Sequence, residues 1–299
     1  MNLSVSYLPT PARIAAVVPE SADTRTFVLD LAGPALAPPA PGQFVMLSLL
    51  GHGEAAFTVS SLHREPAVHS LCLTVRRVGE LTGALFGLAP GAQVGLRGPF
   101  GRGFPDWPAD AAVLFVGGGC GLAPLRPAIE HRLAVRTPDA PTYVVYGAHD
   151  PGARILRADL ERWRAQHGVV VIDPVEESDP CWAGARGDVA SALACALAER
   201  LPDRVAACGP PAMLAAVAQR LRGAGVAPEN VFFAIERQMK CALGVCGRCY
   251  VEDRYVCRDG PVFSLAELDA IDPTTAGHAP ARPTTTAHAE ARPTTAGHA

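Results

Sequence analysis

Four cysteines near the C-terminus have a spacing that suits a metal centre. They are Cys241, Cys246, Cys249 and Cys257. The first three follow the C-x4-C-x2-C pattern, with a fourth cysteine further on, that is typical of plant-type 2Fe–2S clusters. A zinc site is the alternative, although four-cysteine zinc sites favour two C-x2-C units and this segment has only one. The spacing therefore favours an iron–sulfur cluster.

Two glycine-bearing turns are candidate nucleotide sites. The first follows the apolar run 111–116 and contains Gly118, Gly119 and Gly121. Such glycines let the backbone close on a pyrophosphate, and the following helix offers its positive end. The second turn contains Cys208 and Gly209 and follows the strand-like run 204–207. Ligands of open parallel sheets bind where strands end, so the two turns support each other. Cys208 is expected to face the cleft between domains, with a packed cysteine as the alternative.

The N-terminal half contains two weaker motifs. Gly79 and Thr82 precede a helix-like stretch and form an anion site suited to a flavin diphosphate, although a plain helix cap is the alternative. Phe57, Thr58 and Ser60 lie on a strand whose aromatic and hydroxyl positions suit the flanks of an isoalloxazine ring. Ordinary strand alternation is the alternative there.

Composition shifts divide the chain into four parts. Residues 1–107 read as short strands separated by Pro-Gly and Gly-Pro turns, which predicts an antiparallel β-barrel. In residues 108–231 strands and helices alternate, which predicts an open parallel sheet of the α/β class. Residues 232–272 form a short cysteine-rich segment. Residues 273–299 are a degenerate repeat of Pro, Thr, Ala and His without large apolar side chains, so this tail is expected to be disordered.

Charge and hydropathy exclude two classes of partner. The net charge of −3 gives no basic surface for nucleic acid. No run of about 18 apolar residues is present, so we expect no membrane insertion. The N-terminus lacks the pattern of a secretory leader. We therefore expect a cytoplasmic protein whose cysteines stay reduced and serve metals or catalysis.

The order of these motifs resembles that of the ferredoxin–NADP reductase-like flavoproteins. More narrowly, it is similar to the gamma (diaphorase) subunits of soluble nickel–iron hydrogenases and sulfhydrogenases. The corresponding subunit of anaerobic sulfite reductase and the electron-transfer subunit of dihydroorotate dehydrogenase are close relatives. The resemblance spans about residues 17–268, and its stretches include PGQFVMLSL, GPFGRGFP, GGGCGLAPLRP, CGPPAM, ERQMKC and YVCRDGPVF.

The resemblance implies three cofactors, namely FAD, NAD(P) and a 2Fe–2S cluster held by the four cysteines. It assigns the flavin ring and ribityl chain to Phe57, Thr58 and Ser60, and the flavin pyrophosphate to Gly79 and Thr82. It further assigns the nicotinamide dinucleotide to Gly118, Gly119 and Gly121, with Gly209 and the catalytic Cys208 near the nicotinamide ring. One departure is that Glu54-Ala55-Ala56 occupies the stretch where many such reductases carry a phosphate-binding arginine.

The expected function is that of a diaphorase subunit that links NAD(P)H to a catalytic redox partner, with a cytoplasmic nickel–iron hydrogenase as the first candidate. Dihydroorotate dehydrogenase or sulfite reductase is the alternative partner, and a non-catalytic zinc or redox-sensing module is the alternative class. The nucleotide choice stays open, because Asp150 favours a free ribose whereas Arg154 favours a 2′-phosphate.

Overall fold

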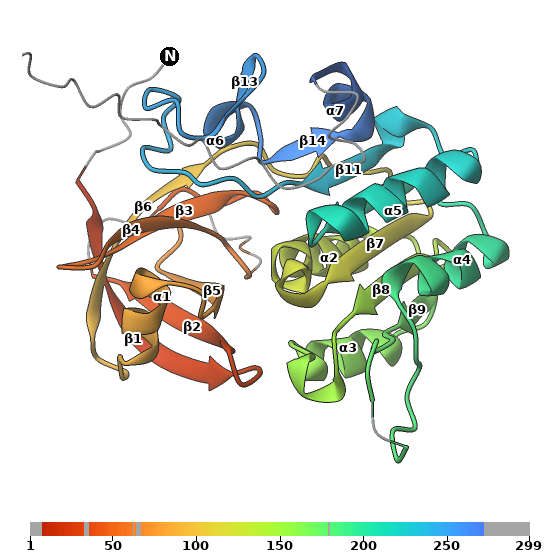
Figure 1. The fold of residues 1–299 in the computed structure, drawn as a ribbon, viewed down its shortest axis with the longest axis horizontal. Helices are drawn as coiled ribbons and strands as arrows, with labels where there is room; N and C mark the ends of the chain where they lie inside the picture. Colours follow the sequence, from red (N-terminus) through yellow and green to blue (C-terminus); the bar gives the residue numbers. More distant parts are fainter. Residues whose placement is uncertain (1–7, 33–35, 62, 64–66, 179, 272–299) are drawn as a thin grey trace, which may run out of the picture.

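The computed structural model describes residues 8–32, 36–61, 63, 67–178 and 180–271. Two sheets lie side by side, and the cysteine-rich segment runs along the top of both (Figure 1). The repeat tail at 273–299 lies outside the described residues, so its predicted disorder stays a prediction. Within the described part of the chain, no helix has the length and apolar character that crossing a membrane requires.

The first sheet has six antiparallel strands in the order β4-β3-β6-β1-β2-β5. They are β1 Thr10–Pro19, β2 Thr24–Leu31, β3 Phe44–Leu49, β4 Gly53–Thr58, β5 Ser70–Arg76 and β6 Gln93–Phe100, and helix α1 Glu80–Phe86 comes between the last two. Alternate residues such as Phe27 and Leu29 are buried in its core, as expected for strands with one wet face. A bridge between Val59 and Leu73 joins the chain beyond β4 to β5 and curls the sheet towards closure. The predicted antiparallel barrel is confirmed.

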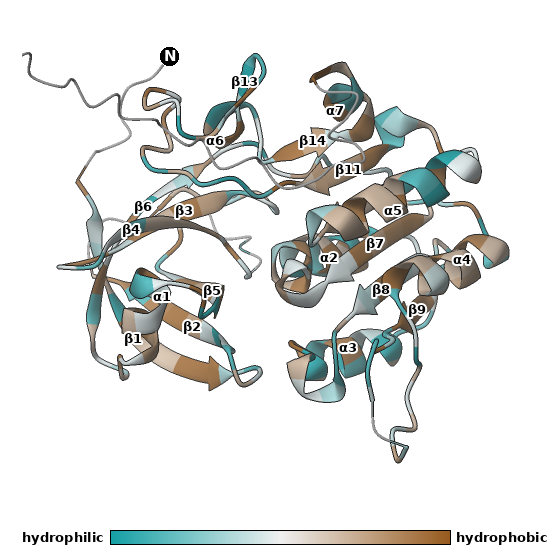
Figure 2. Ribbon diagram, viewed as in Figure 1, coloured by the Kyte–Doolittle hydropathy of each residue, from teal (hydrophilic) through white to brown (hydrophobic). Residues whose placement is uncertain are grey.

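The second sheet is parallel except at one edge. Its strands are β7 Val113–Gly118, β8 Thr142–Gly147, β9 Val169–Ile172, β10 Arg204–Cys208, β11 Val231–Ala234 and β14 Val262–Ser264, in the order β14-β11-β10-β7-β8-β9. Only β14 is antiparallel to its neighbour β11. Figure 2 colours β7 and β14 as strongly apolar, because strands of such sheets are covered on both faces.

Helices cover both faces of this sheet. They are α2 Leu122–Val135, α3 Arg157–Arg164, α4 Val189–Glu199 and α5 Pro211–Gly223. Leu114 and Val116 of β7 pack with α4 and α5, whereas Val113 and Phe115 pack with α2 and α3. The predicted α/β class of this part is confirmed.

The cysteine-rich segment contributes strands to the second sheet and packs against the first. It begins in β11, forms the hairpin β12 Tyr250–Val251 and β13 Arg254–Tyr255, continues through α6 Val256–Asp259 and returns in β14 before α7 Leu265–Ile271. The expected boundary after residue 231 therefore falls within β11. On the other side, Phe44, Met46 and Phe100 of the barrel share a buried cluster with Cys249 and Cys257. The segment thus joins the two halves of the molecule.

Candidate functional site: a pocket shared by three parts of the chain

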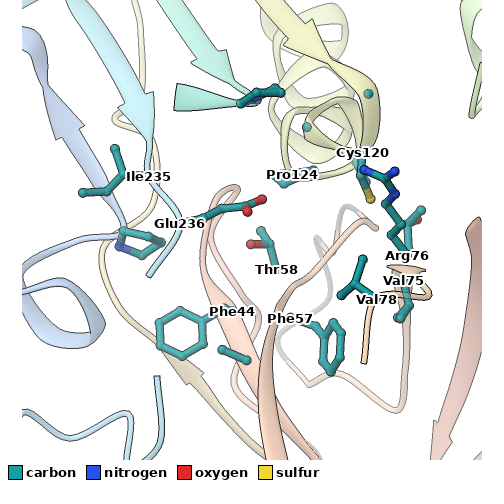
Figure 3. A pocket seen from close by; sticks show the side chains of 18 of the residues that line it. Phe44, Phe57, Thr58, Val75, Arg76, Val78, Cys120, Pro124, Ile235 and Glu236 are labelled. Carbon is teal, nitrogen blue, oxygen red and sulfur yellow. The ribbon is translucent and has the colours of Figure 1, made fainter. Parts of the chain in front are cut away.

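A pocket of about 540 Å³ opens where the barrel, the second sheet and the cysteine-rich segment meet (Figure 3). Seven of the residues assigned to cofactors line it, namely Phe57, Thr58, Thr82, Gly118, Gly119, Gly121 and Gly209. The segment contributes Ile235, Glu236 and Met239 to the opposite wall. Residues more than 100 positions apart in sequence are therefore brought together at one cavity.

Three glycines of the two turns are closely packed, and Gly121, which faces rigid backbone, is the one that this packing requires. A Cβ at Gly118 would lie 2.3 Å from the sulfur of Met213, and one at Gly121 would lie 2.2 Å from the carbonyl oxygen of Cys208. A Cβ at Gly209 would lie 2.5 Å from the methyl carbon of Met213. These glycines therefore let the turns after β7 and β10 pack against each other.

Gly119 differs from the other glycines of this turn. Its φ is +54°, and a Cβ there would meet no atom within 4 Å. It begins the short 3-10 helix Gly119–Gly121, which leads into α2. Gly119 is thus the position at which bare backbone faces the open pocket, next to a helix start that favours a phosphate.

The barrel wall is formed by only some of the predicted residues. Phe57 and Thr58, at the end of β4, line the pocket. Ser60 is fully buried, and its hydroxyl donates to the carbonyl of Cys72 at 3.1 Å and accepts from Thr74 at 3.0 Å. Ser60 therefore serves the interior of the barrel, and the structure does not place it in the pocket wall.

The predicted anion site at the start of α1 is satisfied internally. The hydroxyl of Thr82 accepts the backbone N–H of Gly79 at 2.9 Å and that of Val78 at 3.0 Å. Thr82 lines the pocket, whereas Gly79 is the N-cap residue and does not. These two backbone N–H groups are thus already hydrogen-bonded within the chain.

Cys208 lies behind the pocket wall. It is 1% exposed, and burial raises the pKa of its thiol well above the ordinary value. The cysteine that lines the pocket is Cys120, in the glycine-rich turn. Burial, with a further contribution from the charge of Glu236, raises the pKa of Cys120 to about 12. Both thiols therefore stay protonated at neutral pH, so neither is available as a thiolate.

Glu236 is a pocket residue to which the sequence analysis gave no role. It lies two residues beyond the end of β11, and its carboxyl group points into the cavity towards Thr58 (Figure 3). The side chain stays open to solvent through the pocket mouth, but the protein atoms around it partly desolvate the carboxyl group and raise its pKa above the ordinary value. The signal in the sequence is a charged residue directly after a short apolar run, at the beginning of ERQMKC. A carboxyl group of this kind can hold and release a proton inside the pocket.

The four cysteines lie in two pairs, with Cys241, Cys246 and Cys249 in the loop that follows β11 and Cys257 in α6. Cys241 is hydrogen-bonded to Cys246, and Cys249 to Cys257. Gly244, with φ +72°, turns the loop so that its N–H donates to the sulfur of Cys257 at 3.2 Å. Backbone donors of this kind stabilise thiolates and cluster sulfurs.

Neighbouring hydrogen-bond donors and burial give Cys241 and Cys257 very different pKa values. Burial alone would raise the pKa of Cys241, but N–H groups of Leu243, Val245 and Cys246 outweigh it and lower that pKa to about 6. Burial raises the pKa of Cys257 to about 12, and the hydrogen bond with Cys249 adds to the rise. Cys241 is therefore a readier thiolate ligand than Cys257.

The paired arrangement fits a two-iron cluster. A 2Fe–2S cluster takes four cysteine ligands spread over two irons, and the pairs Cys241–Cys246 and Cys249–Cys257 offer two thiols for each. The donor set thus suits the cluster implied by the spacing.

Family comparisons match all three parts of the chain. Residues 11–104 match the oxidoreductase FAD-binding domain, and residues 115–219 match the oxidoreductase NAD-binding domain. Residues 236–269 match the iron–sulfur cluster binding domain of dihydroorotate dehydrogenase B. The chain therefore carries FAD-binding, NAD-binding and iron–sulfur domains, and the last is of the type that holds a 2Fe–2S cluster.

Two relatives of known name show how far the sequence similarity extends. The chain is 33% identical to sulfhydrogenase 1 subunit gamma of Pyrococcus furiosus, over 76% of this chain and 80% of that protein. It is 38% identical to a probable dihydroorotate dehydrogenase B electron transfer subunit of Thermococcus kodakarensis, over 77% and 86% of the two chains.

Among solved structures, the ferredoxin reductase of carbazole 1,9a-dioxygenase is 25% identical with a TM-score of 0.67, over 78% of this chain and 70% of that one. The fold also matches an NADH-dependent reduced ferredoxin–NADP oxidoreductase chain at 24% identity and a TM-score of 0.70, over 92% and 95% of the two chains. This chain belongs to the ferredoxin reductase-like family of electron-transfer flavoproteins that includes the sulfhydrogenase gamma subunits and the dihydroorotate dehydrogenase B electron transfer subunits.

Proposed function

We propose that this chain is the diaphorase subunit of a cytoplasmic nickel–iron hydrogenase and moves electrons between NAD(P)H and that partner. The observation that supports this most is the shared pocket, which is lined at once by the FAD-binding barrel, the glycine turns of the NAD-binding domain and the segment that carries the four cysteines. Nicotinamides exchange electron pairs and clusters exchange single electrons, and a flavin supplies the chemistry that connects the two.

Each part of the pocket has a proposed task. Phe57 and Thr58 contact the flavin ring, and Thr82 supports its diphosphate end. The backbone around Gly119 receives the dinucleotide pyrophosphate, and Gly118, Gly121 and Gly209 hold the two turns in register. The carboxyl oxygen of Glu236 holds a proton next to the reacting rings. The catalytic role predicted for Cys208 stays a prediction, as do the roles predicted for Ser60 and Gly79.

The proposed partner rests on sequence similarity to proteins of known name. The relative from Pyrococcus furiosus is a sulfhydrogenase gamma subunit, which favours a hydrogenase. The second candidate is a dihydroorotate dehydrogenase. It is favoured by the 38% identity to the protein from Thermococcus kodakarensis and by the family matched at residues 236–269.

The test has two stages. The purified chain is first mixed anaerobically with NADH or NADPH while flavin and cluster absorbance are followed, and both should bleach. A colourless protein that binds zinc would contradict the proposal and support the non-catalytic alternative. The chain is then purified from its host with its partners, and the complex is assayed for nucleotide-linked oxidation of hydrogen and of dihydroorotate. Activity with hydrogen supports the first candidate, and activity with dihydroorotate alone supports the second.

A further inference from the structure

The residues just after β6 contact one short stretch of the cysteine-rich segment. In this stretch a proposed cluster ligand and a residue that lines the pocket are only a few positions apart in sequence. Cys257 lies in α6, which ends before Gly260, and Pro261 lines the pocket. The stretch 260–262 therefore connects the proposed cluster to the proposed flavin site by only a few residues.

Arg102 binds this stretch at several points. Its backbone N–H donates to the carbonyl of Gly260. Its guanidinium donates twice to the carbonyl of Val262, at 2.8 and 2.7 Å, and twice to the carboxylate of Glu267, at 2.8 and 2.7 Å. The same group lies over the ring of Phe263, 5.2 Å from its centre. A guanidinium suits this contact because its planar fork can serve several acceptors at once.

The neighbours of Arg102 fix it to the pocket side of the barrel. The side chain of Gln43 donates to the carbonyl of Gly101 at 2.6 Å, and the next residue, Phe44, lines the pocket. Gly101 has φ +76°, and a Cβ there would lie 2.5 Å from the carbonyl oxygen of Gly260. The two chain segments thus approach as closely as backbones can.

Glu267 is held in place for this contact. It forms a capping box with Ser264, in which the Ser264 N–H donates to the carboxylate at 2.7 Å and the Ser264 hydroxyl accepts the Glu267 N–H at 3.1 Å. The hydrogen bond from Arg102 lowers the pKa of Glu267, so the pair is charged at neutral pH. Both side chains are nearly half exposed, and such pairs contribute little to stability. The contact is therefore better explained by how it positions the segment than by a gain in stability.

We infer that Arg102 is a positioning residue that fixes the cluster-bearing segment against the flavin barrel and so sets the rate of electron transfer between flavin and cluster. The inference rests on the proposed function, and it concerns the placement of the segment rather than the binding of either cofactor. Arg102 itself contacts neither of the proposed cofactor sites.

The test compares Arg102→Met with Arg254→Met. Methionine keeps an unbranched stem over Phe263 but removes every side-chain donor, while the backbone bond to Gly260 remains. Arg254 is a matched control, because it is a half-exposed arginine of the same segment whose ion pair, at 3.3 Å, is with its neighbour Asp253. Iron content, flavin content and reduction of an artificial dye by the nucleotide should equal the wild-type values in both variants. Cluster reduction after mixing with nucleotide should slow severalfold in Arg102→Met alone, because the rate of electron transfer falls steeply as the distance between the two cofactors grows.

A second readout does not depend on activity. Hydrogen–deuterium exchange of the peptide 256–267 should quicken in Arg102→Met and stay unchanged in Arg254→Met. Arg102→Lys keeps the charge but can serve fewer acceptors, so it should be intermediate in both measurements. Glu267→Gln keeps the capping box and loses the charge, and adding it to Arg102→Met should slow cluster reduction no further.

Three results would overturn the inference. They are unchanged cluster reduction in Arg102→Met, loss of iron in parallel with the slower rate, and the same slowing in Arg254→Met. Failure of the proposed function looks different, because the wild-type chain would then show no flavin bleaching by either nucleotide.

Discussion

Arg154 and Asp173 form an ion pair beside the carboxyl end of β9, with both side chains only 13% exposed. The guanidinium of Arg154 also lies 5.4 Å from the ring centre of Trp182. The carboxylate of Asp150 accepts the N–H groups of Gly152 and Ala153 at 2.7 and 2.9 Å. Both residues on which the nucleotide choice depended in the sequence are therefore engaged within the fold.

Other charges at this edge of the sheet predict a preference for NADH over NADPH. The chain beyond β9 runs beside the chain beyond β8, which brings Glu176 and Glu177 each to 3.6 Å from a ring nitrogen of His149. In an open parallel sheet the adenosine ribose lies near such strand ends, and acidic residues there favour a free 2′-hydroxyl over a phosphate.

The expected kcat/KM is higher with NADH than with NADPH. The double variant Glu176→Gln/Glu177→Gln should raise the value for NADPH by about tenfold, because juxtaposed like charges cost several kcal/mol. Glu199→Gln, at the far end of α4, is the control and should change neither value. A wild-type chain that prefers NADPH would contradict the prediction.

Gly119→Val should separate nucleotide use from the rest of the site. The variant forces a branched side chain into a left-handed backbone position and into open pocket space. Reduction of the flavin by nucleotide should fall by at least about tenfold, since a misplacement of about 1 Å can cost a hundredfold. Flavin content and reduction by dithionite should be unchanged.

Gly225→Val controls for backbone strain in that experiment. Gly225 has φ +82° and equally open surroundings, but it lies after α5 and away from the pocket. If nucleotide turnover falls equally in the two variants, strain rather than the dinucleotide site is responsible.

The sequence predicted the parts of the site better than their orientation. The glycine turns and the cysteine spacing are dictated by backbone and ligand chemistry, so they are visible locally. Cys208 was placed in the cleft because it follows a strand, but β10 alternates, and Ala206 and Cys208 share the face that α2 covers. Ser60 was placed on the same strand as Phe57 and Thr58, but β4 ends at Thr58 and the chain turns into the interior of the barrel beyond it.

Long-range pairing was also invisible in the sequence. β11 and β14 are runs of four and three residues, and most of the cysteine-rich segment lies between them. Runs this short carry no sequence pattern that indicates that they pair with each other and extend the second sheet. For the same reason the sequence did not reveal that Glu236 would line the pocket, since its place depends on where β11 docks.

We expect the stability difference between Glu236→Gln and the wild-type chain to depend on pH. Burial raises the pKa of Glu236 in the folded chain, so the folded state binds this proton more tightly than the unfolded state does. The free energy of unfolding should therefore fall as pH rises from the ordinary carboxyl pKa to the raised one. Glu236→Gln has no carboxyl group at this position, so its free energy of unfolding does not fall in this way as the pH rises.

The measurement is thermal unfolding of the flavin-free chain between acidic and neutral pH. At neutral pH Glu236→Gln should melt at a higher temperature than the wild-type chain, and the difference should shrink as the pH falls below the ordinary carboxyl range. Glu229→Gln, on the exposed surface, is the control. A variant that melts lower than the wild-type chain at neutral pH would show that the Glu236 carboxylate is stabilised by its surroundings instead.

Cys249→Ala should separate the two halves of the electron path. Cys249 is buried, and its sulfur accepts the N–H of Cys257 at 3.4 Å, so no solvent ligand can easily take its place. Iron content should collapse, because a cluster with three thiolates is exposed to loss. The residues proposed to bind the flavin and the dinucleotide lie on other elements, so reduction of an artificial dye by nucleotide should persist while transfer to the protein partner fails. Cys195→Ala, at an exposed position of α4, should change neither activity. If both activities survive in Cys249→Ala, the cluster is not on the path. If both vanish, the segment is required for folding, as its two strands in the second sheet would allow.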